Sequence, residues 1–389
     1  MTKILQIIPV LLWLLAVLTG VKPLKFSRLT TILIAFAAAI AFSKFSFFKV
    51  VGGSLTSPDL PPAVIWGFGW LYGAAVAFTV LSIAFSLLDG VFLIFRRPIS
   101  VRFKRIRALL FVIVSIAISL YGIYEGVRVP SVKHVELSLP SLPAEFDGYR
   151  IVHISDLHCS TSIRRERIAR IVERVNALDA DLVAITGDFV DGRVADRRGD
   201  MAPLADLRAK DGVVGCSGNH EFYWEWDEWL KELSGMGIEF PEISGPRTIG
   251  RGTAVMSVGA LADPAIDGVR FASSAFVGVP YGAFKVLLFH RPITEVIDAE
   301  GAGVGLQLSG HTHGGAMPVL RWLVEKVNEG RSRGIYTFGG KGVLYNSSGS
   351  GQWAGFPLRL LTPSEIAEIV LRRKTETTKE ERDGDKRKD

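Results

Sequence analysis

Four long uncharged segments, all before residue 128, constrain the fold of this chain more than any other feature. They cover residues 4–21, 29–42, 63–88 and 108–124. A membrane-spanning helix needs roughly 20 apolar residues, with a range of about 17 to 25. The sequence therefore predicts a transmembrane region of about four helices in residues 1–129. The second segment reaches that length only by continuing to Phe48, with Lys44 extending toward the lipid headgroups.

A cleaved signal peptide is the alternative interpretation of the first segment, because a short charged start precedes its apolar core. No good small-residue cleavage site follows it, however, and three further apolar segments do. These observations favour a helix that stays in the membrane.

The basic residues of the chain are concentrated in the loops of this predicted membrane region. Residues 1–128 carry a net charge of +10, so the remainder carries −4 of the total of +6. This distribution argues against nucleic acid as a specific partner. Six positive residues in 96–107 and three in 22–28 place these two loops in the cytoplasm, and therefore the C-terminal domain outside it. Asp89, the acidic residue beside the third segment, fits an interfacial position better than a transport pathway.

The C-terminal part of the chain, residues 130–371, alternates short apolar runs with one clear helical pattern and is typical of an α/β fold. Residues 365–373 form a last strand or a last helix. From residue 372 to 389 almost no apolar side chain occurs, so we expect a disordered charged tail.

Polar side chains cluster where the predicted strands of this domain end, and five of the seven histidines lie among them. Because the carboxyl ends of parallel strands meet at one edge of a sheet, we expect these side chains to converge. Carboxylate, amide and imidazole ligands suit Mn, Fe, Zn or similar ions. The candidate ligands are Asp156, His158, Asp188, Asn219, His290, His311 and His313. Seven ligands exceed one tetrahedral site and suit two ions that share a carboxylate.

Five short blocks, "DLH", "GDFVD", "GNHE", "FH" and "GHTH", occur in this order between Asp156 and His313. Together they resemble the motifs of the calcineurin-like metallophosphoesterases, and the resemblance extends over about residues 148–372. The surrounding "HTHGG" and "FHRP" are most similar to a bacterial, membrane-associated branch of predicted phosphohydrolases. The resemblance implies a metallophosphoesterase-type β-sandwich flanked by helices, here preceded by the four-helix transmembrane region.

The resemblance also implies a role for each candidate side chain. It makes Asp156, His158 and His313 ligands of one ion, and Asn219, His290 and His311 ligands of the other. Asp188 bridges the two ions. His220 is a catalytic residue that contacts the phosphoryl group or protonates the leaving oxygen, and Asp191 orients it.

The expected reaction is hydrolysis of a phosphate monoester or diester. Two divalent ions, drawn from Mn, Fe, Zn or Mg, would clamp the phosphate oxygens and supply a metal-bridging hydroxide as the nucleophile. The alternative is a metal-binding membrane sensor or scaffold with no turnover. A transporter is disfavoured, since a pathway needs more polar residues within the helices than the single Asp89.

Two segments beside the site bear on the substrate. Residues 221–229, "EFYWEWDEW", place Tyr223, Trp224 and Trp226 either at the rim of a pocket or in the core, while Trp229 is expected to pack inside. Residues 318–333 form a basic amphipathic helix that either rests on a membrane surface or packs on the fold. These features raise the hypothesis of a lipid-linked phosphate ester. Cys159 and Cys216 are expected as two buried thiols, with a disulfide as the alternative.

Overall fold

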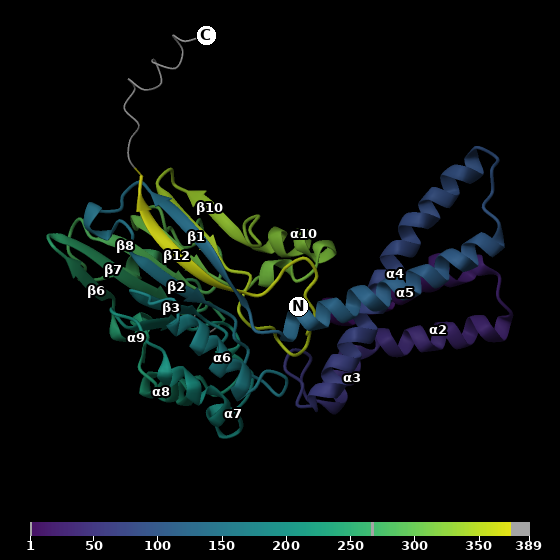
Figure 1. Cartoon of the computed structure of the whole chain (residues 1–389), viewed down its shortest axis with the longest axis horizontal. Helices are drawn as coiled ribbons and strands as arrows, with labels where there is room; N and C mark the ends of the chain where they lie inside the picture. Colours follow the sequence, from purple (N-terminus) through teal and green to yellow (C-terminus); the bar gives the residue numbers. More distant parts are fainter. Residues whose placement is uncertain (1, 266–267, 375–389) are drawn as a thin grey trace, which may run out of the picture.

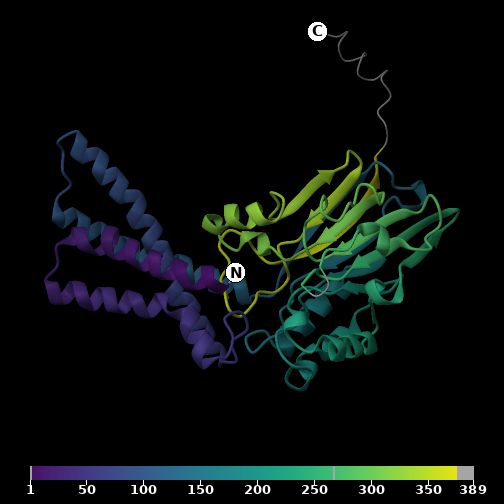
Figure 2. The same ribbon diagram turned by 180° about the vertical axis from the view of Figure 1, so that it is seen from behind.

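The computed structural model describes residues 2–265 and 268–374 and divides them into two parts (Figure 1). A group of apolar helices at the N-terminus extends away from a domain that contains the β-sheets. Figure 2 shows the same arrangement from behind. Residues 375–389, most of the predicted disordered tail, lie outside the described part of the chain.

The apolar segments form helices. The α-helices of this region are α1 (Thr2–Leu15), α2 (Arg28–Phe42), α3 (Lys44–Val51), α4 (Pro62–Ile94) and α5 (Val101–Val127), and two short helical turns, η1 (Ala16–Val21) and η2 (Lys22–Leu24), follow α1. Within the described residues, three helical stretches are long and apolar enough to cross a membrane, and the pair α2 and α3 makes a fourth if the two helices together form one span. That pair is bent by 53°.

The bend changes the predicted environment of Lys44. We expected this side chain to extend toward lipid headgroups, and this prediction is wrong. Lys44 is fully buried and donates a hydrogen bond from Nζ to the backbone oxygen of Gly355, at 2.7 Å. Its ammonium group also lies 4.0 Å from the ring centroid of Phe45 and 4.9 Å from that of Phe356. A cation inside this aromatic cage joins the bent helix pair to the C-terminal domain.

The predicted β-sandwich is confirmed, and it consists of two mixed sheets of six strands each. The first sheet has the order β1 (Ser131–Leu139), β12 (Glu365–Arg373), β2 (Arg150–Ile154), β3 (Leu182–Thr186), β4 (Val213–Cys216) and β5 (Ile238–Glu239). The second has the order β10 (Gly334–Phe338), β11 (Gly342–Asn346), β9 (Val304–Ser309), β8 (Phe284–Phe289), β7 (Ala254–Leu261) and β6 (Arg247–Arg251). Residues 365–373, left open as strand or helix, are therefore a strand.

Apolar side chains alternate along these strands, and those that face inward fill the space between the sheets. This core includes Ile151, Leu182, Val214, Leu288 and Leu308. The helices α6 (Arg165–Asn176), α7 (Val194–Met201) and α8 (Trp226–Gly235) cover the outer face of the first sheet. The loops that contain the predicted site residues follow strands of both sheets.

A separate apolar cluster joins the N-terminal helices to the sandwich. It includes Phe45 and Tyr72 from the helices, and Met317, Phe356 and Leu358 from loops of the C-terminal domain. A backbone hydrogen bond from Arg359 N to the oxygen of Gly122 in α5 supports the same junction. The domain therefore sits directly on the end of the helices and is not held at a distance by a linker (Figure 1).

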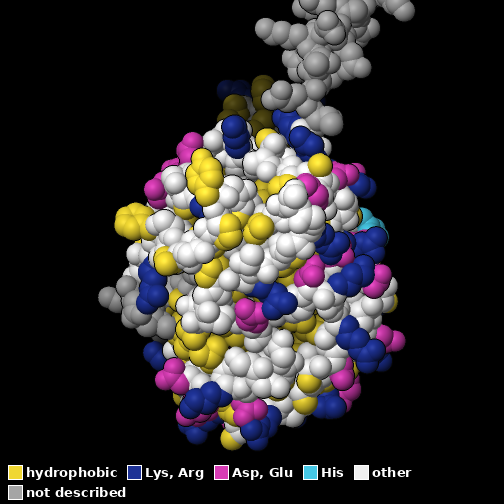
Figure 3. Space-filling model, turned by 90° about the vertical axis from the view of Figure 1, so that its left-hand side faces the viewer, with side chains coloured by type: hydrophobic (Ala, Val, Ile, Leu, Met, Phe, Trp, Pro, Cys, Tyr) yellow, Lys and Arg dark blue, Asp and Glu magenta, His cyan; other side chains and the backbone are white. Residues whose placement is uncertain are grey.

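The opposite end of the sandwich carries side chains of both charges. In Figure 3, which views the molecule from that end, Lys and Arg alternate with Asp and Glu over the visible face. This mixed surface agrees with the net charge of −4 that the sequence gives to residues 129–389.

Candidate metal centre

The predicted site residues come together where five strands end. Asp156 and His158 follow β2, Asp188 and Asp191 follow β3, Asn219 and His220 follow β4, His290 follows β8, and His311 and His313 follow β9. Both sheets contribute, so the site lies across the open end of the sandwich. Eight of these nine side chains are buried, and His311 is partly exposed.

One group of potential ligands consists of Asp156, His158 and His313. The Nε2 atoms of the two histidines lie 3.1 Å apart, and His313 Nε2 is 3.4 Å from Asp156 Oδ1. His158 donates its other ring N–H to Asp191 at 3.1 Å, which leaves Nε2 free to bind a cation. A carboxylate behind a ligand histidine is a common feature of metal sites. These three residues are the set expected for one ion.

A second group consists of Asp188, His290 and His311. His311 Nδ1 lies 3.2 Å from His290 Nε2, and His290 Nδ1 donates to the oxygen of Thr186 at 2.7 Å. Asn219 completes the set expected for the second ion, because its Oδ1 atom is buried and, among the described residues, has no hydrogen-bond partner. A buried acceptor without a partner is a costly feature that a cation would relieve. The nitrogen and oxygen atoms of these side chains therefore suit coordination of a metal ion.

Asp188 belongs to the second group and also reaches the first. Its Oδ2 atom is 3.5 Å from His158 Nε2 and 3.3 Å from His290 Nε2, while Oδ1 accepts a hydrogen bond from the backbone N–H of His220. One carboxylate oxygen thus reaches a histidine of each group. This arrangement suits two divalent ions that share a carboxylate.

His220 and Asp191 form a pair beside the first group. The His220 Nδ1 atom donates to Asp191 Oδ1, and the other carboxylate oxygen accepts from His158. The sequence predicted the first contact but not the second. Because one carboxylate holds both rings, Asp191 fixes His220 relative to a ligand of the metal site.

The backbone at the site is strained. Among the described residues, twelve that are not glycine have a positive φ, and five of the twelve are candidate ligands: Asp156, His158, Asp188, His311 and His313, with values from 47° to 70°. A residue in this region costs of order 1–3 kcal/mol, and such residues cluster at functional sites. Five of the seven candidate ligands have this strained backbone conformation. The rest of the fold must therefore supply the free energy that holds them in place.

The comparisons with known proteins agree with the motifs. The profile of the calcineurin-like phosphoesterases matches residues 149–315. An uncharacterised metallophosphoesterase of Campylobacter jejuni is 30% identical over 290 residues, which cover 70% of this chain and 72% of that protein. The chain belongs to the calcineurin-like phosphoesterase family. The predicted family is therefore confirmed.

A relative from zebrafish, called a transmembrane protein with metallophosphoesterase domain, is 29% identical over 276 residues. The match covers 68% of this chain and 63% of the zebrafish protein, so the chain spans less than two thirds of that relative's length. A crystal structure of a dimetal phosphatase, also from zebrafish, aligns with 53% of this chain and 89% of that one at 13% identity and a TM-score of 0.33. The sequence matches to the Campylobacter jejuni protein and to the zebrafish transmembrane protein show that similar chains occur in animals as well as in bacteria.

In this phosphoesterase two glycines allow the motif loops to approach one another. A Cβ atom at Gly218 would lie 2.3 Å from Asp188 Oδ1, and one at Gly310 would lie 2.3 Å from Asp156 Oδ2. Both distances are too short for a real contact. The glycines of "GNHE" and "GHTH" are therefore required by the space beside the carboxylates.

Glu221, the last residue of "GNHE", has a structural role that the sequence analysis missed. Its buried carboxylate accepts backbone N–H bonds from Asp188, Phe189 and Gly218, at 3.0, 2.6 and 2.7 Å. Burial and the nearby Asp188 raise its pKa to about 7, against the opposing effect of these hydrogen bonds. Glu221 thus holds the loops after β3 and β4 together.

Burial and neighbouring charges shift the pKa values of four histidines at the phosphoesterase site. Burial by itself lowers the pKa of His220, but Asp191 and Asp188 outweigh it and raise the value to about 9. Burial and neighbouring positive groups lower the pKa of His311 and His313. Burial also lowers the pKa of His290, but Asp188 outweighs it and raises the value to about 10, so the pKa shifts alone do not separate the candidate ligands from His220. An imidazolium at His220 can donate a proton, and neutral rings at His311 and His313 can bind a cation.

The aromatic side chains that follow "GNHE" lie partly at the surface and partly in the core. Trp229 is fully buried, and Trp226 packs edge-on against Phe240 in the core cluster, while Trp224 lines a pocket. Tyr223 is exposed and receives a hydrogen bond from Asn219 at 3.3 Å. The two cysteines are buried free thiols, so the alternative of a disulfide is not observed.

Proposed function

We propose that this protein is a membrane-anchored, binuclear metal-dependent phosphoesterase that hydrolyses phosphate monoesters or diesters. The observation that carries the proposal is the position of Asp188 between two groups of ligands, each with two histidines whose ring nitrogens face one another. The complete set of ligands, together with the His220–Asp191 pair, favours turnover over a scaffold that only binds metal.

We assign the residues as the family resemblance implied. Asp156, His158 and His313 would hold one ion, and Asn219, His290 and His311 would hold the other. Asp188 would be shared between them. Bound in this way, two divalent ions would activate a water molecule and neutralise charge on the phosphate oxygens.

We propose that His220, held by Asp191, acts on the leaving oxygen. His220 Nε2 points toward the ligand set, at 4.0 Å from Asp188 Oδ2, and its Nδ1–H is held by Asp191. A charged imidazolium in this position can donate its Nε2 proton to the leaving oxygen as the ester bond breaks. His220 is 6% exposed, so bulk water has little access to compete for this proton.

A membrane anchor is supported by the exposed apolar faces of the N-terminal helices. Leu29 and Phe36 of α2 are 67% and 66% exposed, and Leu109 and Ile113 of α5 are 62% and 55% exposed. Isolated exposed leucines are normal in soluble proteins, but continuous apolar faces of this length are typical of helices in lipid.

We further propose that the catalytic domain lies outside the cytoplasm. The two positively charged loops meet at the far end of the helices, where Arg105 donates to the oxygens of Leu24 and Lys25. The catalytic domain is attached at the opposite end (Figure 1). Asp89 also lies at the charged end, paired with Lys104 and Arg107, which suits an interfacial residue.

This topology predicts the behaviour of reporter fusions. An alkaline phosphatase fused after Pro140 should be active, because it would be exported, whereas the same enzyme fused at Arg107 should be inactive. Enzyme activity in whole cells, normalised to fusion protein on a blot, is the measurement. Activity at Arg107 alone would reverse the assignment.

We propose a lipid-linked ester as the substrate, supported by the helix that follows the last motif. This helix, α10 (Pro318–Val327), lies at the end of the domain that faces the apolar helices (Figures 1 and 2). Trp322 and Val327 are 62% and 72% exposed, and the basic residues Arg321 and Lys326 are exposed beside them. Such a surface suits the interface of an anionic membrane.

We expect the purified full-length protein with Mn to hydrolyse phosphate esters, and to cleave lipid-linked esters in phosphatidylserine-containing vesicles about tenfold faster than soluble analogues. Trp322→Glu should lower this ratio of rates, and Tyr281→Glu, which changes a more exposed aromatic outside α10, should leave it unchanged. Equal rates on both substrates, with no effect of Trp322→Glu, would contradict the lipid-linked substrate. Absence of hydrolysis with Mn, Mg, Zn and Fe would contradict the phosphoesterase itself.

A further inference from the structure

Two basic segments that are about 80 residues apart in the sequence meet at the end of the helices that lies away from the catalytic domain (Figure 1). Arg105, near the start of α5, donates hydrogen bonds to the backbone oxygens of Leu24 and Lys25, both at 3.0 Å. Its guanidinium group also lies 4.9 Å from the ring centroid of Phe26. We call the surface that these two segments form the basic end. Its basic residues are Lys22, Lys25, Arg28, Arg96, Arg97, Arg102, Lys104, Arg105 and Arg107.

Positive charge is in large excess at the basic end. Its one acidic residue is Asp89, which pairs with Lys104 at 3.1 Å and with Arg107 at 2.7 Å. Nine positive residues against one carboxylate leave a net charge of +8. Within the described part of the chain, the seven other cations have no acidic side chain at salt-bridge distance. Because like charges repel one another, a negatively charged partner would stabilise this end of the helices.

The cations lie next to apolar side chains that no other part of the described chain covers. Arg96 and Arg97 are exposed, and they directly follow Leu93, Ile94 and Phe95, which are 64%, 78% and 71% exposed. A phospholipid suits this combination, because its acyl chains contact the apolar side chains while its phosphate pairs with the cations. A nucleic acid or another soluble polyanion would pair with the cations but leave the apolar side chains in water.

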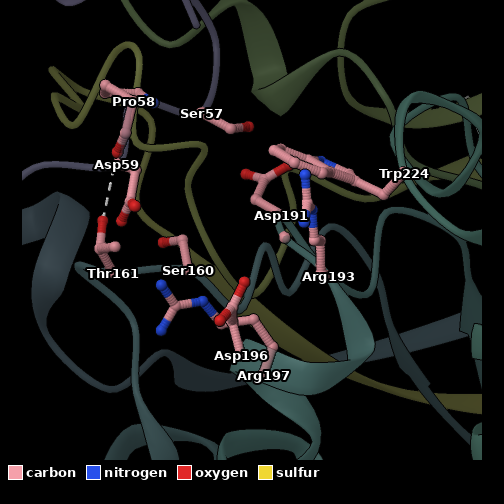
Figure 4. A pocket seen from close by; sticks show the side chains of 11 residues that line it. Ser57, Pro58, Asp59, Ser160, Thr161, Asp191, Arg193, Asp196, Arg197 and Trp224 are labelled. Carbon is pink, nitrogen blue, oxygen red and sulfur yellow. Dashed lines mark hydrogen bonds between the residues drawn. The ribbon is translucent and has the colours of Figure 1, made fainter. Parts of the chain in front are cut away.

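The opposite end of the helices, where the loop between α3 and α4 meets the catalytic domain, has a different balance of charge. Asp59 of this loop lies beside Thr161 in a pocket that contains side chains of both signs (Figure 4). The other charged residues that line it are Asp191, Arg193, Asp196 and Arg197. Three carboxylates and two guanidinium groups nearly cancel, so this end attracts an anion far less than the basic end does.

The basic end is far from the metal centre. Helix α5 begins at the basic end and has 27 residues, which at the usual rise per residue extend over about 40 Å. Near its other end, the oxygen of Gly122 accepts the hydrogen bond from Arg359 N of the catalytic domain. A lipid at the basic end is therefore a bound partner and not a substrate of the metal centre. In the proposed topology it belongs to the cytoplasmic leaflet.

We propose that the basic end binds an anionic phospholipid of the cytoplasmic leaflet through the phosphate of its head group. Basic residues of both loops take part, and the apolar residues 93–95 contact the acyl chains. Because the two loops belong to different helices, the bound lipid also holds these helices together and stabilises the helical region. The inference goes beyond the phosphoesterase function and rests on the proposed membrane anchor.

Lipid binding to the full-length protein tests this proposal. The protein, in detergent and with a chelator that prevents metal-dependent hydrolysis, is mixed with equal amounts of phosphatidylglycerol and phosphatidylcholine, and native mass spectrometry counts the bound lipids. We expect phosphatidylglycerol to bind roughly 10²-fold more tightly. High salt should weaken this preference, because exposed charges are screened. The midpoint of thermal unfolding should rise with phosphatidylglycerol and remain unchanged with phosphatidylcholine.

Two double variants remove two positive charges from one loop each. Arg96→Gln with Arg97→Gln should lower the preference for phosphatidylglycerol about tenfold, and so should Lys22→Gln with Lys25→Gln. The matched control, Arg208→Gln with Lys231→Gln, removes the same charge from exposed residues of the catalytic domain and should retain the preference. Should one loop variant fail to fold, the variant of the other loop and the salt dependence of the wild-type protein still decide the outcome.

Equal binding of the two lipids to the wild-type protein, or an unchanged preference in the loop variants, would overturn the proposal. Binding of soluble polyphosphate with no preference for phosphatidylglycerol would also overturn it, because recognition would then not involve a lipid. Extraction of the full-length protein from membranes by alkaline carbonate would contradict the membrane anchor itself. A protein that resists extraction but shows no lipid preference would contradict this inference alone.

Discussion

Replacement of His220 by alanine should lower turnover by roughly 10²- to 10⁴-fold while the protein keeps both metal ions. The reason is its position outside the two proposed ligand sets. His220 reaches Asp188 Oδ2 only at 4.0 Å, and its backbone N–H, which alanine retains, is the group that bonds Asp188 Oδ1. The substitution therefore removes a proton donor and leaves the carboxylate between the two ligand groups in place.

His158→Ala is the matched comparison, because both rings contact Asp191. Here we expect the metal content to fall from about two ions per chain to about one, since the group of Asp156, His158 and His313 loses its central member. Metal analysis by mass spectrometry and single-turnover kinetics on both variants are the measurements. Equal metal loss in the two variants would contradict the separate roles, and it would favour a ligand role for His220 within the cluster it forms with His158 and Asp191.

The contacts of Asp191 show what sequence reasoning can and cannot recover at such a site. The five motif blocks predict the candidate ligands because each block follows a strand, and the carboxyl ends of these strands meet at one edge of a sheet. The number of hydrogen bonds that Asp191 makes depends on the angle between loops from β2, β3 and β4, which no spacing in the sequence encodes. The role of Glu221 was missed for the same reason, as its partners are backbone N–H groups and carry no side-chain signal.

The helical region shows a second limit. Apolar length predicted where the helices lie, because the hydrophobic thickness of a membrane sets that length. It did not predict the bend between α2 and α3, because the partner that makes a buried Lys44 stable is the backbone oxygen of Gly355, 311 residues later. Features that depend on contacts between the N-terminal helices and the C-terminal domain therefore could not be predicted from the sequence of either part alone.

Substitution of Asp188 by asparagine should have the largest effect on metal binding. This carboxylate is 2% exposed and lies close to His158 and His290, one from each ligand group. Asparagine has nearly the same shape and can still accept the hydrogen bond from His220 N, but it lacks the negative charge that two cations would share. We expect both ions to bind much more weakly and turnover to fall by more than about 10³-fold.

Thermal unfolding gives a readout of this variant that does not depend on activity. An ion that binds only the folded protein at 100 times its Kd stabilises it by about 2.7 kcal/mol, which for a domain of this size raises Tm by roughly 5–10 °C. Mn should produce this rise in the wild-type protein and in Asp206→Asn, which changes an exposed carboxylate away from the site, and a chelator should reverse it. In Asp188→Asn the rise should be nearly absent. Without metal, this variant should be less stable than the wild-type protein at neutral pH. Burial raises the pKa of Asp188, but His290, His220 and His158 outweigh it and hold that pKa well below its usual range, so the carboxylate charge stabilises the folded protein. A full Mn-dependent rise in Asp188→Asn would show that the shared carboxylate is not needed to hold the ions.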